Sequence, residues 1–459
     1  MDNIEQLVWI RSMEWGYYKH PPLPTWLLWA AAQVFGASPM LTYVLGAACT
    51  MSAAVLLWQL LVKVRGPAYA VVALLAALCI TFYNGRLYYY NHNTLLLLAT
   101  AASATLAYGA ITRRNLCLWA ALGAVLGLGG MVKYQTAITA MSVFAYWLSQ
   151  RGWRDSRQRI GLLIAVLVAI VIDAPHLRWA VTNDSGPVGY AITASSGAHF
   201  NAFSRLREAA NWLSDQVLNR ALPAWFVLAV AWGPCRQNIS RNAMAAVPPR
   251  SDPARALLLC WGFVPLVFIA ILGILTGAEL QAQWGTAFLL FLVPAVMELL
   301  RWSERSPAKF QVRHALYAFA ALQLLLLLLH FVTSPFGPAQ WRVSHWRNFD
   351  APTLAARVAG PALLALGGPI QVVIGPQNLA GAIALQLSYA PLVLIDGRYD
   401  ISPWVPADLV RRCGALQIGS RTQVEGGLPI GIDFPDMYWK IVHPEPGAKA
   451  CPSIPKSRN

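Results

Sequence analysis

Two carboxylates stand three residues apart at the start of the chain, Asp2 and Glu5, in a stretch that reads MDNIEQLVWIRSMEWGYYKHPPLPTWLL. This spacing fits a helical capping box, in which an acceptor at the cap precedes a glutamate by three positions. A carboxylate held at a membrane surface can also act as a general base toward an attacking hydroxyl. The two roles are compatible, because one residue can cap a helix and face a substrate.

The residues around this pair predict a short amphipathic helix. Arg11 and Glu14 exclude burial in lipid, so we expect the helix to lie at the membrane interface. Pro21 and Pro22 are expected to end it, because proline cannot continue a helix. The apolar side consists of Ile4, Leu7, Val8 and Trp15.

Composition places the chain among membrane proteins. Of its 459 residues, 57% are hydrophobic and 12% are charged, whereas a soluble domain carries about 25% charged residues. The net charge of +15 is explained by basic loops between apolar spans, which argues against nucleic-acid binding. The predicted fold class is a polytopic α-helical membrane protein of about ten transmembrane helices, each needing roughly 20 residues to cross. The spans are 40–62, 67–83, 94–111, 116–132, 135–149, 160–175, 217–234, 256–277, 282–300 and 314–333.

The basic loops also predict orientation. Clusters of lysine and arginine follow every second span, so these loops are expected to face the cytoplasm. The remaining segments then face outward: 1–39, 84–93, Lys133–Tyr134, 176–216, 278–281 and everything after 334. As an alternative, the two short spans 116–132 and 135–149 form a single broken or re-entrant membrane segment around Lys133. An outward start predicts a further transmembrane helix upstream of Asp2; the alternative is that 1–39 crosses unaided.

Residues 335–459 change character. The short apolar runs IQVVIG, PLVLID, GALQIG and YWKIVHP predict strands of a small α/β domain on the outer side. In that oxidising compartment, Cys413 and Cys451 either form a disulfide or remain two free thiols. The predicted domains are therefore 1–39, an outer loop with an interfacial helix, 40–334, the transmembrane domain, and 335–459.

The opening stretch resembles the first outer loop of the GT-C membrane glycosyltransferases. The nearer branch comprises protein O-mannosyltransferases and the lipid A aminoarabinose-transferase and galacturonosyltransferase-like proteins. An acidic pair is followed there by a G-Y-Y/F turn and P-P-L, as in Gly16-Tyr17-Tyr18 and Pro21-Pro22-Leu23. The segments YYNHNTLLLL, GLGGMVKYQTAI, APHLRWAVTND and QWGTAF are similar to later family segments.

This resemblance implies a glycosyltransferase in the bacterial inner membrane, with its active site and C-terminal domain facing the periplasm. The donor would be a polyprenyl-phosphate-linked sugar, the acceptor a lipid, glycan or protein of the envelope, and the reaction an inverting displacement. Asp2 would be the general base and Glu5 its support. Cations would stabilise the departing phosphate: Lys19, His20, Arg86 and Lys133. Substrate contacts would come from Tyr17, Tyr18, Asn91, His92, Asn93 and His176.

Several of these residues could instead have a purely structural role. Lys133 could simply snorkel to the interface, and Arg86 could be an anchor in an aromatic belt. Asp173, an intramembrane acid, is either functional or paired with Arg178. No cofactor is predicted. The sequence leaves a divalent metal open but does not indicate one, because the family's second acidic position reads Asn91-His92-Asn93 here. The alternative function is a transporter or flippase for lipid-linked glycan precursors, which should show repeated halves; a sensory membrane protein is a third.

Overall fold

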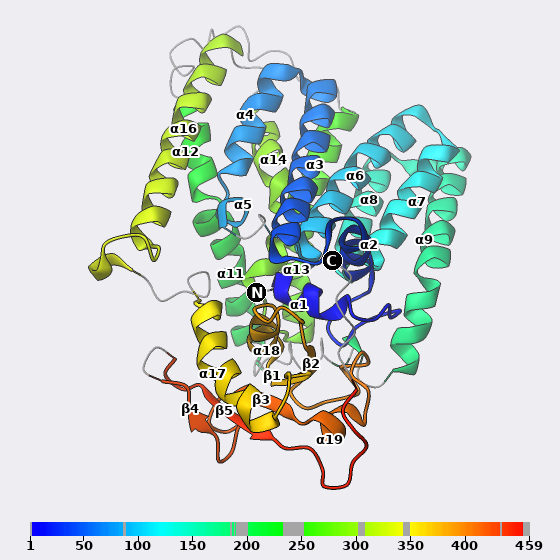
Figure 1. Ribbon diagram of the computed structural model, residues 1–459. Helices are drawn as coiled ribbons and strands as arrows, with labels where there is room; N and C mark the ends of the chain where they lie inside the picture. Colours follow the sequence, from blue (N-terminus) through cyan, green and yellow to red (C-terminus); the bar gives the residue numbers. More distant parts are fainter. Residues whose placement is uncertain are drawn as a thin grey trace, which may run out of the picture. The chain divides into compact units, whose positions relative to one another are not determined.

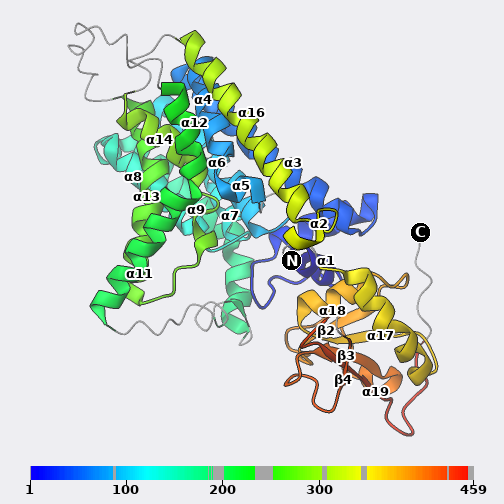
Figure 2. The same cartoon turned by 90° about the vertical axis from the view of Figure 1, so that its left-hand side faces the viewer.

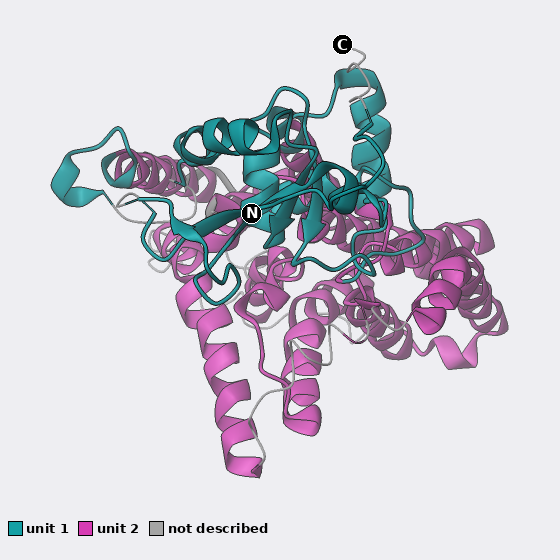
Figure 3. Cartoon of the chain, turned by 60° about the horizontal axis from the view of Figure 1, so that its bottom comes forward, with its two compact units in different colours: residues 1–18, 25–42, 332–459 teal, residues 19–24, 43–331 magenta. Residues whose placement is uncertain are grey.

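The computed structural model describes residues 2–85, 89–183, 186, 187, 189, 201–232, 252–301, 308–342, 349–431 and 434–452. The chain falls into two compact units, which have different colours in Figure 3. Unit 1 consists of residues 1–18, 25–42 and 332–459, and unit 2 of residues 19–24 and 43–331. The chain therefore passes from unit 1 to unit 2 between Tyr18 and Lys19, inside the opening stretch.

The described residues of unit 2 form helices joined by turns and loops, with no strand among them (Figure 1). Five helices of the described chain are long and apolar enough to cross a membrane: α3 (Pro39–Arg65), α6 (His92–Arg113), α9 (Ser156–Thr182), α13 (Pro253–Thr276) and α16 (Ala308–Thr333). Shorter elements lie between them: α4 (Pro67–Leu78), α5 (Thr81–Gly85), α7 (Leu116–Gly130), α8 (Thr136–Ser149), η1 (Gly152–Arg154), α11 (Ala202–Ser214), η2 (Asp215–Arg220), α12 (Leu222–Trp232), η5 (Ala282–Gly285), η6 (Leu289–Phe291) and α14 (Leu292–Leu299). The predicted class, a largely helical membrane protein, is confirmed.

Helices α7 and α9 of unit 2 pack side by side, and glycine makes this close approach feasible. A Cβ atom at Gly123 would lie 2.4 Å from the carbonyl oxygen of Ala165. Small residues allow such packing between helices in a membrane, where backbones meet through van der Waals contact. The same packing brings Gly130, the last residue of α7, against Asp173 of α9.

The C-terminal part of unit 1 forms a five-stranded sheet with the strand order β2-β1-β3-β5-β4 (Figure 1). Strand β1 is parallel to both neighbours, with Val373 paired to Val393 and to Leu416, whereas β5 is antiparallel to β3 and β4. All of β1 is buried, as expected for a parallel strand covered on both faces. The elements are α17 (Ala351–Leu366), β1 (Val372–Gly375), α18 (Gln377–Ala384), β2 (Leu392–Ile395), α19 (Leu409–Cys413), β3 (Ala415–Gly419), β4 (Leu428–Pro429) and β5 (Tyr438–Val442), preceded by η7 (Ala339–Trp341).

The opening helix α1 (Asp2–Trp9) packs against α18 within unit 1, as Figures 1 and 2 both show. A Cβ atom at Gly381 would lie 2.6 Å from Cγ2 of Ile4 and 3.0 Å from Cγ2 of Val8, so α1 lies directly on the backbone of α18. Val8 and Trp9 belong to the same buried core as the strands. Much of the apolar side that the sequence assigned to the membrane interface is therefore buried against protein.

Helix α1 also ends earlier than the sequence predicts. It stops at Trp9, and the chain then turns back so that the ring of Tyr17 stacks on Trp9 with centroids 4.8 Å apart. The Tyr17 hydroxyl donates to the carbonyl oxygen of Ser12 at 2.7 Å and closes this turn. The prediction that Pro21 and Pro22 end the helix is wrong, because tertiary packing ends it first. Helix α2 (Leu23–Phe35) begins directly after these prolines.

Each predicted span contains helix, but 67–83 is divided into α4 and α5, and 282–300 is divided into 3-10 turns and α14. The number of transmembrane helices and the predicted domain boundaries stay predictions. Each of the four C-terminal apolar runs contains a strand. Cys413 and Cys451 form a disulfide, so the first of the two alternatives for these cysteines is the one observed.

Candidate functional site

The acidic pair lies on α1 in unit 1. Asp2 is exposed, whereas Glu5 is buried. Two neighbouring polar side chains fasten this helix: Asn3 donates from Nδ2 to Oγ1 of Thr42 at 3.3 Å, and Gln6 accepts at Oε1 from the Thr25 hydroxyl at 2.9 Å. Helix α1 is thus held on one side by polar contacts to the α2 and α3 segments of unit 1 and on another by α18.

In unit 2, the short segment 19–24 is bound to two other segments. The amide of Leu23 donates to the carbonyl oxygen of Met131 at 3.0 Å, and the Tyr90 hydroxyl donates to that of Pro24 at 2.9 Å. Met131 begins the turn between α7 and α8, and Tyr90 lies two residues before the first residue of α6. These bonds therefore join three segments that are distant in sequence.

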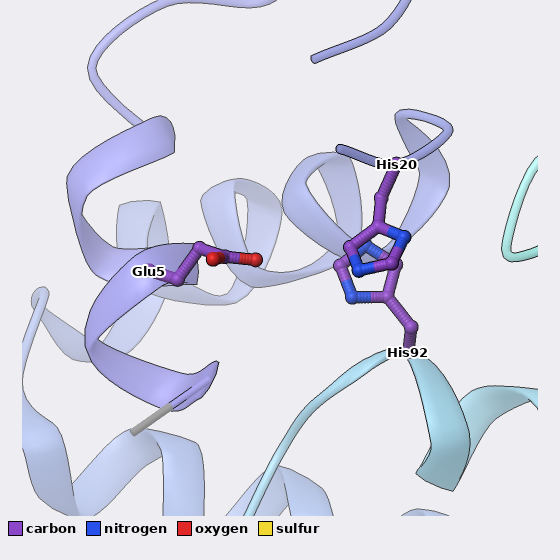
Figure 4. A group of neighbouring side chains, drawn as sticks. All are labelled: Glu5, His20 and His92. Atoms are coloured by element: carbon purple, nitrogen blue, oxygen red, sulfur yellow. The ribbon is translucent and has the colours of Figure 1, made fainter. Parts of the chain in front are cut away.

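The joined segments bring together five of the predicted site residues, which we call the cationic cluster: Lys19, His20, His92, Asn93 and Lys133. The rings of His20 and His92 face one another with centroids 3.9 Å apart (Figure 4), and Glu5, which Figure 4 also draws, belongs to α1 of unit 1. Lys133 donates from Nζ to Oδ1 of Asn93 at 2.8 Å. The lysine is thus held by the start of α6 rather than extended alone toward the interface.

The electrostatics of the cluster appear in the pKa of His20. Burial is the largest cause that lowers this pKa well below its ordinary value, and electrostatic repulsion from the nearby His92, Lys133 and Lys19 side chains lowers it further. His20 is therefore neutral near pH 7 and can donate or accept a hydrogen bond. An anion bound among these groups would relieve their mutual repulsion.

Three of the predicted substrate contacts have structural partners. Asn91 is the N-cap of α6, and its side-chain oxygen accepts from the backbone amides of Asn93 and Thr94. Tyr17 is buried in the turn after α1. Tyr18 donates its hydroxyl to Oε1 of Gln377 at 3.0 Å. The predicted phosphate contact Arg86 lies outside the described residues.

A further predicted residue, His176, is fully buried on α9, where its Nε2 lies 3.0 Å from the Tyr134 hydroxyl. Burial, with the nearby Asp173 carboxylate, raises the pKa of Tyr134 to about 12, which keeps this tyrosine a neutral donor. Among the described residues, Asp173 forms no salt bridge with Arg178, the partner that the sequence offered. Sequence reasoning missed Tyr134, whose only signal was its position directly after Lys133.

The part of the chain that contains these residues is similar to known proteins. Residues 19–179 match the family model for dolichyl-phosphate-mannose-protein mannosyltransferase, a range that contains the cationic cluster, Tyr134 and His176. The chain is 25% identical over 314 residues to the lipid A galacturonosyltransferase RgtD of Rhizobium johnstonii, covering 66% of this chain and 61% of that protein. It is 28% identical over 239 residues to an undecaprenyl phosphate-α-4-amino-4-deoxy-L-arabinose arabinosyl transferase of Pectobacterium carotovorum, covering 48% and 39%.

The chain thus spans about three fifths and two fifths of the length of these two relatives. Among solved structures it resembles ArnT from Cupriavidus metallidurans bound to undecaprenyl phosphate, with a TM-score of 0.59 and 14% identity over 96% of this chain and 93% of that one. The apo structure of ArnT gives the same TM-score over 92% and 88%. The predicted resemblance to GT-C glycosyltransferases of the lipid A-modifying type is confirmed.

Proposed function

We propose that this chain, which has the fold of the ArnT structures, transfers a sugar from a polyprenyl-phosphate donor to an acceptor of the bacterial envelope. The observation that carries the proposal is the cationic cluster, which gathers two lysines and two histidines with Asn93 in unit 2. Such a set suits a lipid phosphate, because it supplies positive charge and hydrogen-bond donors in a partly buried place. The match of residues 19–179 supports it as well.

In this reaction, the acceptor hydroxyl attacks the anomeric carbon of the donor sugar while the bond from that carbon to the phosphate oxygen breaks. The electron pair of the broken bond stays on the phosphate, where the cluster stabilises the charge. Asp2 accepts the hydroxyl proton as general base, and Glu5 supports it. The anomeric configuration inverts, and the products are the glycosylated acceptor and polyprenyl phosphate.

Tyr18 ends the unit 1 segment that carries α1, and Lys19 of the cluster is the next residue. We also propose that α1, the cationic cluster and residues 335–459 lie on the periplasmic side of the inner membrane, as the distribution of basic loops predicts. The acceptor is a lipid, glycan or protein of the envelope, and the named activity of RgtD favours lipid A.

Mass spectrometry of envelope glycolipids and glycans, with and without the gene, tests the function. Deletion should remove one sugar mass from one envelope component, and the wild-type gene should restore it. Asp2→Asn should fail to restore it although the protein is inserted at wild-type level, while Glu14→Gln, which removes another acid of the opening stretch, should restore it. An unchanged envelope after deletion would contradict the proposed function, and full restoration by Asp2→Asn would exclude Asp2 as the base.

A further inference from the structure

A second polar cluster lies in unit 2 beside the turn between α7 and α8. We call it the Asp173 cluster, and it consists of Tyr134, Asp173, His176 and Trp179. The Tyr134 hydroxyl and His176 Nε2 are 3.0 Å apart. The three rings form a stack, with centroids 5.7 Å apart for Tyr134 and His176 and 6.1 Å apart for His176 and Trp179. Flat aromatic faces next to hydrogen-bonding groups suit a ligand with both apolar and polar sides.

Asp173 is the unusual member of this cluster. It lies within α9, a 27-residue helix that is long and apolar enough to cross a membrane. Its Oδ2 would lie 2.9 Å from a Cβ atom at Gly130, so the missing side chain of that glycine leaves room for the carboxylate. Its Oδ1 is buried and accepts no hydrogen bond from the described residues. Ionisable groups within membrane spans are costly and point to function by default.

The cluster is linked to the cationic cluster through one turn. Lys133 reaches Asn93, and the next residue, Tyr134, reaches His176. A sugar that is joined to the bound phosphate has to lie within a few bonds of it. Tyr134 directly follows Lys133, to which the proposed function assigns the phosphate, so the Asp173 cluster begins one residue from that contact.

We propose that the Asp173 cluster binds the donor sugar and that its carboxylate selects a sugar with amino or hydroxyl donors over a uronic acid. This inference rests on the proposed function and names its substrate class. An ammonium or hydroxyl group donates to the unsatisfied carboxylate oxygen. A uronate would place a second carboxylate beside Asp173 in a medium of low dielectric constant, where like charges repel strongly. By their names, one of the two relatives transfers a galacturonosyl group and the other an aminopentose. The charge of Asp173 would therefore distinguish between the sugar classes of these two relatives.

Binding of two matched donors to the full chain in detergent tests this. Both probes carry the same undecaprenyl phosphate, one with 4-amino-4-deoxy-L-arabinose and one with galacturonic acid. We expect wild type to bind the amino sugar at least about tenfold more tightly. Asp173→Asn, which keeps the shape and removes the charge, should reduce this ratio toward one and leave the affinity for undecaprenyl phosphate unchanged. Tyr134→Phe should weaken both sugar donors and leave undecaprenyl phosphate unchanged.

The control is Glu279→Gln, which removes an exposed acid on the same predicted side of the membrane and should leave the ratio unchanged. Equal binding of both donors by wild type, or a ratio that Asp173→Asn leaves intact, would overturn the inference. A separate transfer assay with the same donors distinguishes this failure from that of the proposed function. Selective binding without transfer from either donor would contradict the proposed transferase function and support the sugar site. Transfer from both donors without selective binding would support the transferase function and contradict the sugar site.

Discussion

The hydroxyl of Tyr18 donates to Oε1 of Gln377 at 3.0 Å and joins the end of the opening stretch to the first residue of α18. Tyr18 directly precedes Lys19 of the cationic cluster, so this bond is one of the last fastenings of unit 1 before the chain enters unit 2. A second bond, from Arg11 Nη2 to the carbonyl oxygen of Ala390 at 3.1 Å, fastens the same stretch nearer α1. The C-terminal residues therefore act as a scaffold for the acidic helix.

Tyr18→Phe removes this bond and keeps the ring. We expect a loss of about 1 kcal/mol in the stability of unit 1, the usual net value of one hydrogen bond, and a severalfold lower kcat with unchanged donor affinity. Thermal unfolding and transfer kinetics measure the two effects. A Tyr18→Phe variant that loses donor affinity but keeps kcat would instead place Tyr18 in the donor site, as the sequence predicted.

Gly381→Ala tests the packing of α1 on α18. The added Cβ would lie 2.6 Å from Ile4 Cγ2, so α1 has to shift. We expect kcat to fall at least tenfold while donor binding persists, because the acidic pair moves and the cationic cluster does not. The matched control is Gly360→Ala on α17, where a Cβ meets nothing within 4 Å. Equal kcat values for the two variants would show that the position of α1 does not limit transfer.

Lys133→Met removes the charge that Asn93 holds in place and keeps much of the side-chain length. A hydrogen bond to a charged group contributes about 1.5–3 kcal/mol, so the Kd for undecaprenyl phosphate should rise roughly 10- to 150-fold. The control is Lys63→Met, on the predicted cytoplasmic side of the membrane, which should leave the Kd for undecaprenyl phosphate unchanged. Unaltered binding by Lys133→Met would favour a lysine that only snorkels to the interface.

The lowered pKa of His20 predicts a pH dependence of stability. Below about pH 6.5 the unfolded chain binds a proton at this histidine, whereas the folded chain does not. The contribution of His20 to the free energy of unfolding is therefore fully present above that pH and decreases as the pH falls, by at most about 1.4 kcal/mol per pH unit. The melting temperature should fall between pH 7.5 and pH 5.5, and less so for His20→Gln. The control is His443→Gln, which replaces an exposed histidine of unit 1; its melting temperature should decrease with pH as that of wild type does. Identical pH profiles of the melting temperature for His20→Gln and wild type would contradict this assignment.

The disulfide between Cys413 and Cys451 joins residues 38 positions apart in unit 1. Cys451→Ser should lower the stability of that unit by about 2–4 kcal/mol, the usual range for a bridge of this kind. Cys117→Ser, which replaces an exposed free cysteine, is the control. Disulfides persist in the periplasm and rarely in the cytosol. Trapping of free thiols in whole cells therefore also tests orientation, and reduced Cys413 and Cys451 would speak against an outward C-terminal part.

Much of the architecture could be predicted from the sequence. Long apolar runs such as those of α3, α9 and α13 have to be helices that satisfy their own backbone in lipid, and the short runs after residue 370 have the length and composition of strands. The types of the phosphate-binding candidates could also be predicted, because a lysine and a histidine before two prolines and a lysine between two spans are unusual in so apolar a chain.

The sequence by itself determined that this is a many-helix membrane protein with an acidic start and scattered cations. Only the tertiary structure decided which of them meet: that Lys133 bonds Asn93, that His20 faces His92, and that Asp173 lies against Gly130 beside Tyr134. It also decided that α1 packs on α18 rather than lying on lipid. The physical reason is that an apolar face is equally satisfied by lipid or by protein, and a local pattern contains no information about which surface folding will bring to it.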